Sequence, residues 1–230
     1  MAPTFSREVE AQHRRIDPTA WADVYVVGDV HGCPRAIDRL LAATDASADD
    51  LFVFVGDLVR KGPDSAAVVE RVREADNMLS VRGNNEEKLL RGEKALAGLD
   101  ESDLDWLRSL PVAISWPGGL AVHGGVDPRK PMTDHDVDDL QTTRATEPGG
   151  GYDGPFWYES YDGPPRVFFG HTVHENPVVT DHAVGLDTGY VYGGSLTAFR
   201  LADERVVRVD APRTTVERRD AKIVSVPTLG

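Results

Sequence analysis

The sequence predicts an α/β protein whose second half changes to α+β, with two sheets stacked on one another. In the first half, short apolar runs rich in valine, leucine and phenylalanine alternate with helical patterns, as in a largely parallel sheet. In the second half, β-rich runs follow one another with turn residues between them, which favours a mostly antiparallel second sheet. The 230 residues suit one sizeable domain, and the 40% of hydrophobic residues supply its core.

Each predicted strand of the first half is short and apolar, and a helix follows it. The strands are expected at residues 25–27, 51–55 and 78–81. Pro34 opens the first helix, which runs through Leu41, because proline is tolerated in a first helical turn. The second helix starts at Pro63 and has an apolar face formed by valines, and the third covers about residues 85–91.

The second half opens with a short helix over residues 103–110, which Pro111 ends. Pro117-Gly118-Gly119 then predicts the turn of a hairpin between residues 112–115 and 120–122. Residues 126–165 are rich in glycine, proline and aspartate, with one helical pattern near 137–140; so long an irregular segment is usually functional or mobile. Further strands are expected at 167–169, 178–180, 183–186, 196–201 and 205–209.

The ends of the chain are expected to lie outside the core of the single domain, residues 1–230. Residues 1–20 form an N-terminal arm or short helix in this prediction. Residues 211–230 form a polar C-terminal tail, loosely held from Pro212 on.

Composition argues against several classes of function. No apolar stretch approaches the roughly 20 residues that span a bilayer, and residues 1–20 lack the apolar segment of a secretory signal. The single cysteine, Cys33, rules out an internal disulfide and any multi-cysteine metal site, so we expect a cytoplasmic protein. The net charge of −13 repels polyanions, and neither membrane binding nor stable nucleic-acid binding is expected.

Five short polar motifs come after β-rich runs and carry the candidate chemistry. They are Gly28-Asp29-Val30-His31-Gly32, Gly56-Asp57, Gly83-Asn84-Asn85-Glu86, His123-Gly124-Gly125 and Gly170-His171-Thr172. Together they offer two aspartates, three histidines and one asparagine at strand ends, which is the ligand set of a two-metal phosphoesterase site. A single motif of this kind is usually a turn or a helix cap, but turn chemistry does not explain five in order.

Spacing indicates how these residues meet. Asp29 and His31 are two residues apart, so in an extended chain they project to the same side and reach one ion. Asp57 ends the next strand, and the ends of adjacent parallel strands converge on one crevice. Asp57 has two carboxylate oxygens and could therefore bridge two ions. Carboxylate, amide and imidazole ligands without a thiolate suit Mn, Fe or Zn better than Ca.

The series GDVHG, GDLVRKGPDS, RGNNE, HGG and GHT resembles the calcineurin-like metallophosphoesterases of the phosphoprotein phosphatase superfamily, over roughly residues 23–200. The resemblance implies a four-layer α-β-β-α sandwich, in which two mixed sheets are flanked by helices. It also implies two divalent metal ions as cofactors, with Mn expected and Fe, Zn, Co or Mg as alternatives. The implied ligands of the first ion are Asp29, His31 and Asp57. The implied ligands of the second are Asp57, Asn84, His123 and His171.

Two departures from the protein-phosphatase pattern concern the substrate. Those enzymes carry Asp-Arg-Gly where this chain has Arg60-Lys61-Gly62, and Gly-Asn-His-Glu where it has Asn85 in place of the histidine. In that family the histidine is the proposed proton donor and the aspartate orients it. The present pattern resembles instead the ApaH-like phosphatases, relatives of the diadenosine tetraphosphate hydrolases. That resemblance implies phosphate binding by Lys61 and Arg144, to which Arg60 either adds or stays a solvated loop residue.

The function predicted is that of an enzyme, a metal-dependent hydrolase of phosphate bonds whose nucleophile is a metal-bridging hydroxide. The residues expected at the centre of catalysis are Asp57, Asn84, Asn85 and His123. Phosphoanhydrides are the expected substrates, namely dinucleoside or nucleoside polyphosphates or polyphosphate, because their leaving groups are stable anions that need no general acid. The alternatives are a Ser/Thr phosphoprotein phosphatase and, from another class, a catalytically silent phosphate-binding scaffold.

Other polar and aromatic residues have two readings each. His174 is either a substitute proton donor or a supporting or surface residue, and Asp187 either orients a ligand histidine or belongs to a turn. Five aromatic side chains in the irregular segment either stack on a nucleobase or, as we expect for most of them, pack this segment on the core. They are Tyr152, Phe156, Trp157, Tyr158 and Tyr161.

Overall fold

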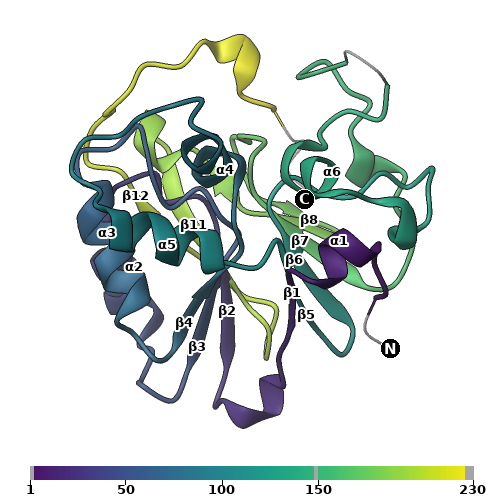
Figure 1. Cartoon of the computed structure of the whole chain (residues 1–230), viewed down its shortest axis with the longest axis horizontal. Helices are drawn as coiled ribbons and strands as arrows, with labels where there is room; N and C mark the ends of the chain where they lie inside the picture. Colours follow the sequence, from purple (N-terminus) through teal and green to yellow (C-terminus); the bar gives the residue numbers. More distant parts are fainter. Residues whose placement is uncertain (1–2, 148–149, 226–230) are drawn as a thin grey trace.

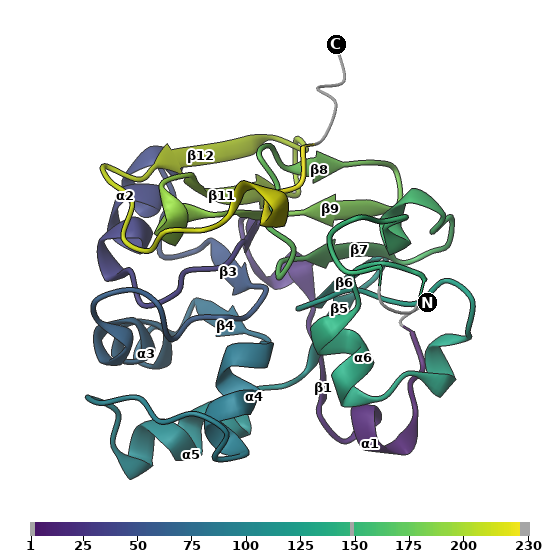
Figure 2. The same ribbon diagram turned by 90° about the horizontal axis from the view of Figure 1, so that it is seen from above.

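The computed structural model describes residues 3–147 and 150–225, which form two six-stranded mixed sheets packed face to face, with helices on both outer faces. Figures 1 and 2 show the layers: α2, α3 and α5 cover one sheet, and α1 and α6 lie on the side of the other. This is the four-layer sandwich that the sequence predicts. Within the described residues, no helix is long and apolar enough to span a bilayer.

The first sheet has the strand order β10-β11-β2-β3-β4, with β12 paired to the outer side of β11. Its parallel part is β2 (Val24–Val27), β3 (Leu51–Phe54) and β4 (Met78–Ser80), at the places predicted. The strands β10 (Asp187–Thr188), β11 (Ser195–Arg200) and β12 (Val206–Asp210) extend it in antiparallel fashion.

The second sheet has the order β1-β5-β6-β7-β9-β8. The predicted hairpin is present as β5 (Ala113–Trp116) and β6 (Gly119–Val122), which pair in antiparallel register. The strands β7 (Arg166–Phe169) and β9 (Ala183–Gly185) continue the sheet in parallel to β6, and β8 (Val178–Val179) pairs antiparallel with β9. The strand β1 (His13–Arg15) runs parallel to β5 at the other edge.

One prediction about the sheets was wrong. The second half does not form one mostly antiparallel sheet, since β11 and β12 return to the first sheet and β6, β7 and β9 are parallel. The long segment between β6 and β7 is what allows this, because parallel neighbours need a crossover of a dozen or more residues. The N-terminal arm contains the expected short helix, at residues 7–10, and in addition an edge strand, β1, whose polar sequence His-Arg-Arg does not predict it.

The helices lie where helical patterns predict them, with shifted ends. They are α1 (Arg7–Glu10), α2 (Pro34–Thr44), α3 (Ser65–Arg73), α4 (Asn84–Leu90), α5 (Glu101–Ser109) and α6 (Val137–Thr142). Capping explains the starts: Asp64 accepts a hydrogen bond from the backbone N–H of Ala67, and Asp100 accepts one from that of Asp103. Short 3₁₀ turns are η1 (Pro18–Ala20), η2 (Met132–Asp134), η3 (Trp157–Glu159), η4 (Tyr190–Tyr192) and η5 (Asp220–Lys222).

The core between the two sheets fixes their relative position. Aliphatic residues of β2 and β3 meet β5, β6, β7 and β9 there. The ring of Phe168 in β7 lies 5.7 Å from that of Phe199 in β11 and 5.4 Å from that of Trp116 in β5, measured between centroids. Because this layer is dry and closely packed, the ends of β2, β3, β6 and β7 are held close together.

The aromatic residues of the irregular segment mostly pack on the outer face of the second sheet, as we expect. Trp157 and Tyr158 are buried against Phe169, Phe156 is buried and stacks on Tyr158, and Trp157 Nε1 donates to the carbonyl oxygen of Gly124 at 3.2 Å. Tyr161 is partly buried in the same cluster. Tyr152 differs, since it lies outside this cluster beside Arg144.

The C-terminal tail is held more firmly than predicted over its described part. The backbone N–H groups of Thr215 and Val216 donate to the carbonyl oxygen of Val191, each at 3.0 Å, and Val224 N–H donates to that of Val173 at 2.8 Å. The tail is therefore attached at both ends of residues 215–224. The remainder of the predicted tail, residues 226–230, lies outside the described residues.

Replacing Trp157 by alanine is expected to lower the free energy of unfolding by about 3–5 kcal/mol, because it removes a fully buried ring from the second-sheet core. Urea unfolding followed by circular dichroism measures the change. Trp21→Ala, which removes a half-buried ring, is the control and is expected to cost less. Equal losses in the two variants would contradict a core role for Trp157.

Candidate metal centre and phosphate site

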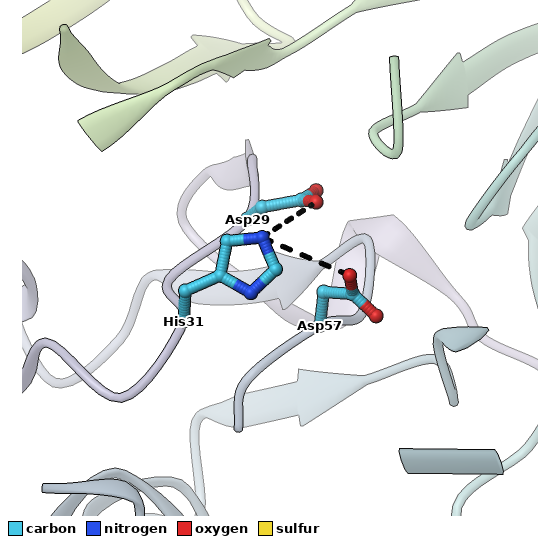
Figure 3. Close-up of side chains that lie close together, drawn as sticks. All are labelled: Asp29, His31 and Asp57. Carbon is cyan, nitrogen blue, oxygen red and sulfur yellow. Dashed lines mark ion pairs between the residues drawn. The ribbon is translucent and has the colours of Figure 1, made fainter. Parts of the chain in front are cut away.

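The candidate ligands lie together although they come from five segments of the chain. Asp29 and His31 follow β2, Asp57 follows β3, Asn84 begins α4, and His123 and His171 follow β6 and β7. Two carboxylates from separate strand ends and one imidazole form the first group. Ligand atoms of Asp29, His31 and Asp57 all lie within 4.8 Å of one another, and the three side chains are buried (Figure 3).

In this first group the imidazole presents Nε2 to the carboxylates. His31 Nε2 lies 3.7 Å from Asp29 Oδ2 and 3.8 Å from Asp57 Oδ2 (Figure 3). Its other nitrogen, Nδ1, lies 3.4 Å from the carbonyl oxygen of Val59, which can accept its N–H. A histidine that donates from one ring nitrogen offers a lone pair on the other, as a metal ligand must.

The second group forms on the other carboxylate oxygen of Asp57. His123 Nε2 lies 3.3 Å from Asp57 Oδ1 and 3.0 Å from Asn84 Oδ1. His171 Nδ1 lies 3.3 Å from the same Asn84 oxygen. His123 Nδ1 contacts the carbonyl oxygen of Val55 at 2.8 Å, which leaves Nε2 to face the group. Asp57 is therefore shared by both groups, as the bridging role requires.

The surroundings of the Asn84 amide fit a cation. With Oδ1 turned towards the histidines, this oxygen faces only acceptors, including Asp57 Oδ2 at 3.3 Å, while Nδ2 faces the ammonium of Lys88. Lone pairs that converge in this way repel one another, and a divalent ion among them would stabilise them. Turned by 180°, the amide donates to Asp57 and accepts from Lys88, so without an ion this orientation satisfies its hydrogen bonds, and a bound cation would favour the other.

The electrostatics of the buried groups point the same way. Burial raises the pKa of Asp29 well above its usual value, and the charges of Asp187 and Asp57 add to the rise. Burial and the charge of Lys61 lower the pKa of His31 to about 3, and burial and Arg144 lower the pKa of His171. Neutral imidazoles at His31 and His171 beside the costly charge of Asp29 favour a bound metal cation. At His123 burial lowers the pKa, but the charge of Asp57 and other contacts outweigh it, and the net pKa is raised.

The backbone is strained where the ligands sit. His31, Asp57 and His171 have φ angles of 50°, 52° and 64°, in the left-handed region that non-glycine residues avoid. Arg60 and Lys61 lie there too, with φ angles of 71° and 66°. Each such residue costs roughly 1–3 kcal/mol, so the surrounding structure must hold these turns in place.

Glu86 provides much of that support, and the sequence analysis assigned it no role. Its buried carboxylate accepts the backbone N–H groups of Asp57 at 2.9 Å, Val59 at 3.0 Å and Gly83 at 2.8 Å. It thereby ties the second motif to the third. The signal for it was the glutamate three residues after Gly83, at the position of a capping box.

Two glycines are required by close approaches around the aspartates. A Cβ atom on Gly83 would lie 2.5 Å from both the backbone nitrogen and Oδ1 of Asp57. A Cβ atom on Gly170 would lie 2.0 Å from Asp29 Oδ1. The backbone N–H of His171 lies 3.3 Å from both Asp29 oxygens, so the fifth motif is fitted onto the first.

The structure brings Lys61 and Arg144 to the ligand groups. Lys61 Nζ lies 2.8 Å from His31 Nε2, and Arg144 Nη2 lies 2.7 Å from His171 Nε2. Arg144 Nε also donates to Thr172 Oγ1 at 3.1 Å, which fixes the plane of the guanidinium. Burial lowers the pKa of Lys61, but Asp57, Tyr192 and Asp187 together outweigh burial and the net pKa is raised. Each ligand group thus has a cationic side chain beside it.

Arg60 and Asn85 occupy adjoining positions and contact each other. Arg60 Nη1 donates to Asn85 Oδ1, and Asn85 Nδ2 donates to Asp57 Oδ2. The backbone N–H of Asn85 donates to the other oxygen of Asp57 at 2.8 Å. Arg60 is therefore a half-buried partner of Asn85 and not the solvated loop residue of the alternative reading.

His174 has the supporting role of its alternatives, and Asp187 has the turn role. His174 is buried, not at the surface, and its Nε2 lies 3.0 Å from the hydroxyl of Tyr158 within the aromatic cluster. Asp187 Oδ1 accepts the backbone N–H of Gly189 at 3.0 Å, a turn contact. In the described part of the chain, no hydrogen bond joins the Asp187 side chain to a histidine.

Comparison with known proteins agrees with this geometry. The family described as calcineurin-like phosphoesterase matches residues 22–207. The symmetrical bis(5'-nucleosyl)-tetraphosphatase of Janthinobacterium sp. (strain Marseille) is 28% identical, over 82% of this chain and 96% of its own length. Serine/threonine-protein phosphatase 1 of Salmonella typhimurium is 42% identical, but over only 35% of this chain and 38% of its own.

A solved structure shows the same architecture. A crystal structure provisionally named a diadenosine tetraphosphatase superposes with a TM-score of 0.78 at 29% sequence identity. The match covers 87% of this chain and 98% of that one. The likeness therefore extends over both sheets and the strand ends between them.

Replacing Glu86 by glutamine is expected to lower the free energy of unfolding by roughly 1–3 kcal/mol, since the amide nitrogen of glutamine cannot accept one of the three backbone N–H groups that the two carboxyl oxygens accept. Urea unfolding measures this. The exposed Glu93→Gln is the matched control and is expected to change little. An unchanged unfolding midpoint for the Glu86 variant would show that its carboxylate does not hold the two loops.

Proposed function

The chain belongs to the calcineurin-like phosphoesterase family, and we propose that it hydrolyses phosphoanhydride bonds in small phosphorylated molecules. Metal-dependent hydrolysis at phosphorus is the activity of the family. The choice of an anhydride depends on one observation, the Arg60–Asn85 pair beside a full set of candidate ligands.

The ligand groups support a site for two divalent ions. Asp29, His31 and Asp57 would hold one ion, and Asp57, Asn84, His123 and His171 would hold the other. Such ions, when bound, polarise the phosphoryl oxygens and lower the pKa of the attacking water. Oxygen and imidazole ligands without a thiolate suit Mn, Fe or Zn better than Ca, and manganese is the ion we expect, with Fe, Zn, Co or Mg as alternatives.

Lys61 and Arg144 would bind the oxygens of the phosphoryl group under attack. Both lie at the ligand histidines, and Thr172 holds the Arg144 guanidinium in one orientation. Cationic donors fixed in this way stabilise the negative charge that builds up on the phosphoryl oxygens as the bond breaks. They are also needed locally, since the chain as a whole carries a net charge of −13.

The leaving group is where Arg60 and Asn85 matter. A guanidinium does not give up its proton near neutral pH and an amide is no acid, so this pair supplies no general acid. General acid catalysis contributes roughly 10²–10⁴-fold where an alkoxide leaves, and its absence harms an anhydride much less. Dinucleoside polyphosphates, nucleoside polyphosphates and inorganic polyphosphate are therefore the proposed substrates, and the named activity of the Janthinobacterium relative favours the first.

A Ser/Thr phosphoprotein phosphatase is the second candidate. The segment of 82 residues shared with the Salmonella phosphatase favours it. The same Arg60–Asn85 pair argues against it, because an alkoxide must leave from phosphoserine. The cytoplasmic location expected from the sequence stays a prediction.

Removing the metal is expected to abolish hydrolysis of diadenosine tetraphosphate, and added Mn²⁺ is expected to restore it. Asp57→Asn should lower kcat by at least about 10²-fold, because the shared carboxylate serves both ligand groups. Activity and metal content by mass spectrometry are measured together, with the exposed Asp181→Asn as control. A wild-type protein that binds no metal and turns over no substrate with Mn²⁺ would support the scaffold alternative.

Restoring the missing pair is expected to shift the substrate preference. The double variant R60D/N85H should raise kcat/KM for a phosphoserine peptide by tenfold or more, a conservative share of the roughly 10²–10⁴-fold that a general acid contributes. The value for diadenosine tetraphosphate, nucleoside triphosphate and polyphosphate should rise much less. R60A/N85A, which removes the pair without supplying an acid, is the control. The proposal fails if the wild-type enzyme already cleaves the phosphopeptide as well as all three anhydrides.

A further inference from the structure

Arg218, in the C-terminal tail, lies at the mouth of the phosphate site although no motif contains it. The tail arches over the top of the molecule in Figure 1, from the side of the first sheet towards that of α6. It is attached to η4 through Val191 on one side of Arg218 and to the segment after β7 through Val173 on the other. These two attachments hold residues 215–224 over the strand ends that carry the ligands.

Two tyrosines connect Arg218 to the two phosphate-binding cations. Its Nη2 donates to the hydroxyl of Tyr152 at 2.8 Å, and its guanidinium lies 4.6 Å from the centroid of the Tyr192 ring. The ring of Tyr152 also lies 4.1 Å from the guanidinium carbon of Arg144, and that of Tyr192 lies 5.3 Å from Lys61 Nζ. The rings of both tyrosines are thus already in contact with cationic side chains.

The position of Arg218 gathers positive charge at one place. Its charge reaches the site, since it is among the causes, after burial, that lower the pKa of Arg144. Within residues 3–147 and 150–225, no carboxylate lies within 4.0 Å of its guanidinium. Its Nε donates to the carbonyl oxygen of Lys222 at 2.9 Å, and Nη1 makes no hydrogen bond to the described residues. A fork donor with free N–H groups beside two further cations suits an anion with several charges.

We propose that Arg218 binds a second phosphate of the substrate, next to the one that Lys61 and Arg144 hold, and so makes the site selective for chains of linked phosphates. This inference rests on the proposed function and specifies its substrate class. A monoester has a single phosphate and leaves Arg218 unused. A chain of three or more phosphates has a further anionic group to reach the tail while its attacked phosphorus stays at the ligand groups.

The test compares Arg218→Ala with Arg219→Ala, a neighbouring and exposed arginine of the same tail. With Mn²⁺ present, Arg218→Ala is expected to lower kcat/KM for inorganic tripolyphosphate by about tenfold to hundredfold, the loss of one charge-assisted contact. The value for p-nitrophenyl phosphate should stay within twofold of wild type. Arg219→Ala should change neither value, and Arg218→Lys should recover part of the loss because it keeps the charge.

Binding gives a readout that does not depend on turnover. Calorimetry on chelator-treated protein should show weaker binding of tripolyphosphate to the Arg218→Ala variant, with binding of orthophosphate unchanged. Equal losses for both substrates, or no loss, would overturn the proposal, as would a loss on diadenosine tetraphosphate without one on tripolyphosphate, which would mark a nucleoside contact. If wild-type protein hydrolyses nothing with Mn²⁺, the proposed function fails, and the calorimetric comparison still decides whether Arg218 binds linked phosphates.

Discussion

The carboxylate of Glu86 is the contact on which the geometry of the site depends. It accepts the backbone N–H groups of Asp57, Val59 and Gly83, in a fully buried position. Asp57 sits in a left-handed turn that is unfavourable by itself, and its side chain belongs to both ligand groups. A displaced Asp57 would disturb both groups at once. The strain of this turn is therefore offset by hydrogen bonds to a residue that, within the described part of the chain, makes no hydrogen bond to the site histidines, Lys61 or Arg144.

Much of the fold follows from the sequence because local signals were strong there. Apolar runs such as β2 and β3 are buried on both faces, and hydrophobicity alone reveals them. The sequence pattern of β11 does not show which of the two sheets the strand joins. Its pairing with the free edge of β2 places it in the first sheet. The strand β1 is stabilised by pairing with β5, and its three residues are half-buried or exposed, so no local pattern reveals it.

The same distinction holds for the site. The motifs with a metal-ligand pattern were readable because each is a short run of contiguous residues after a strand. Glu86 was in view within a motif, but its role depends on backbone groups 27 and 29 residues away. Arg218 is 66 residues from Tyr152, and only the return of the tail across the molecule brings the two together. Residues that act through long-range contacts have no characteristic spacing in the sequence, so their roles cannot be predicted from it.

Because the molecule as a whole is strongly negative, the cationic side chains at the site are needed to attract an anionic substrate. A surface with a net charge of −13 repels a polyphosphate at a distance, so attraction must come from groups close to the reacting phosphorus. Lys61 and Arg144 lie within hydrogen-bond distance of the ligand histidines, and the two tyrosines hold Arg218 near them. Like charges gathered in a half-buried place repel one another, and a bound anion with several charges relieves that repulsion more than one with a single phosphate. The repulsion among these cations raises the free energy of the protein without substrate. The selectivity of the site for linked phosphates would then arise because such a substrate relieves this repulsion.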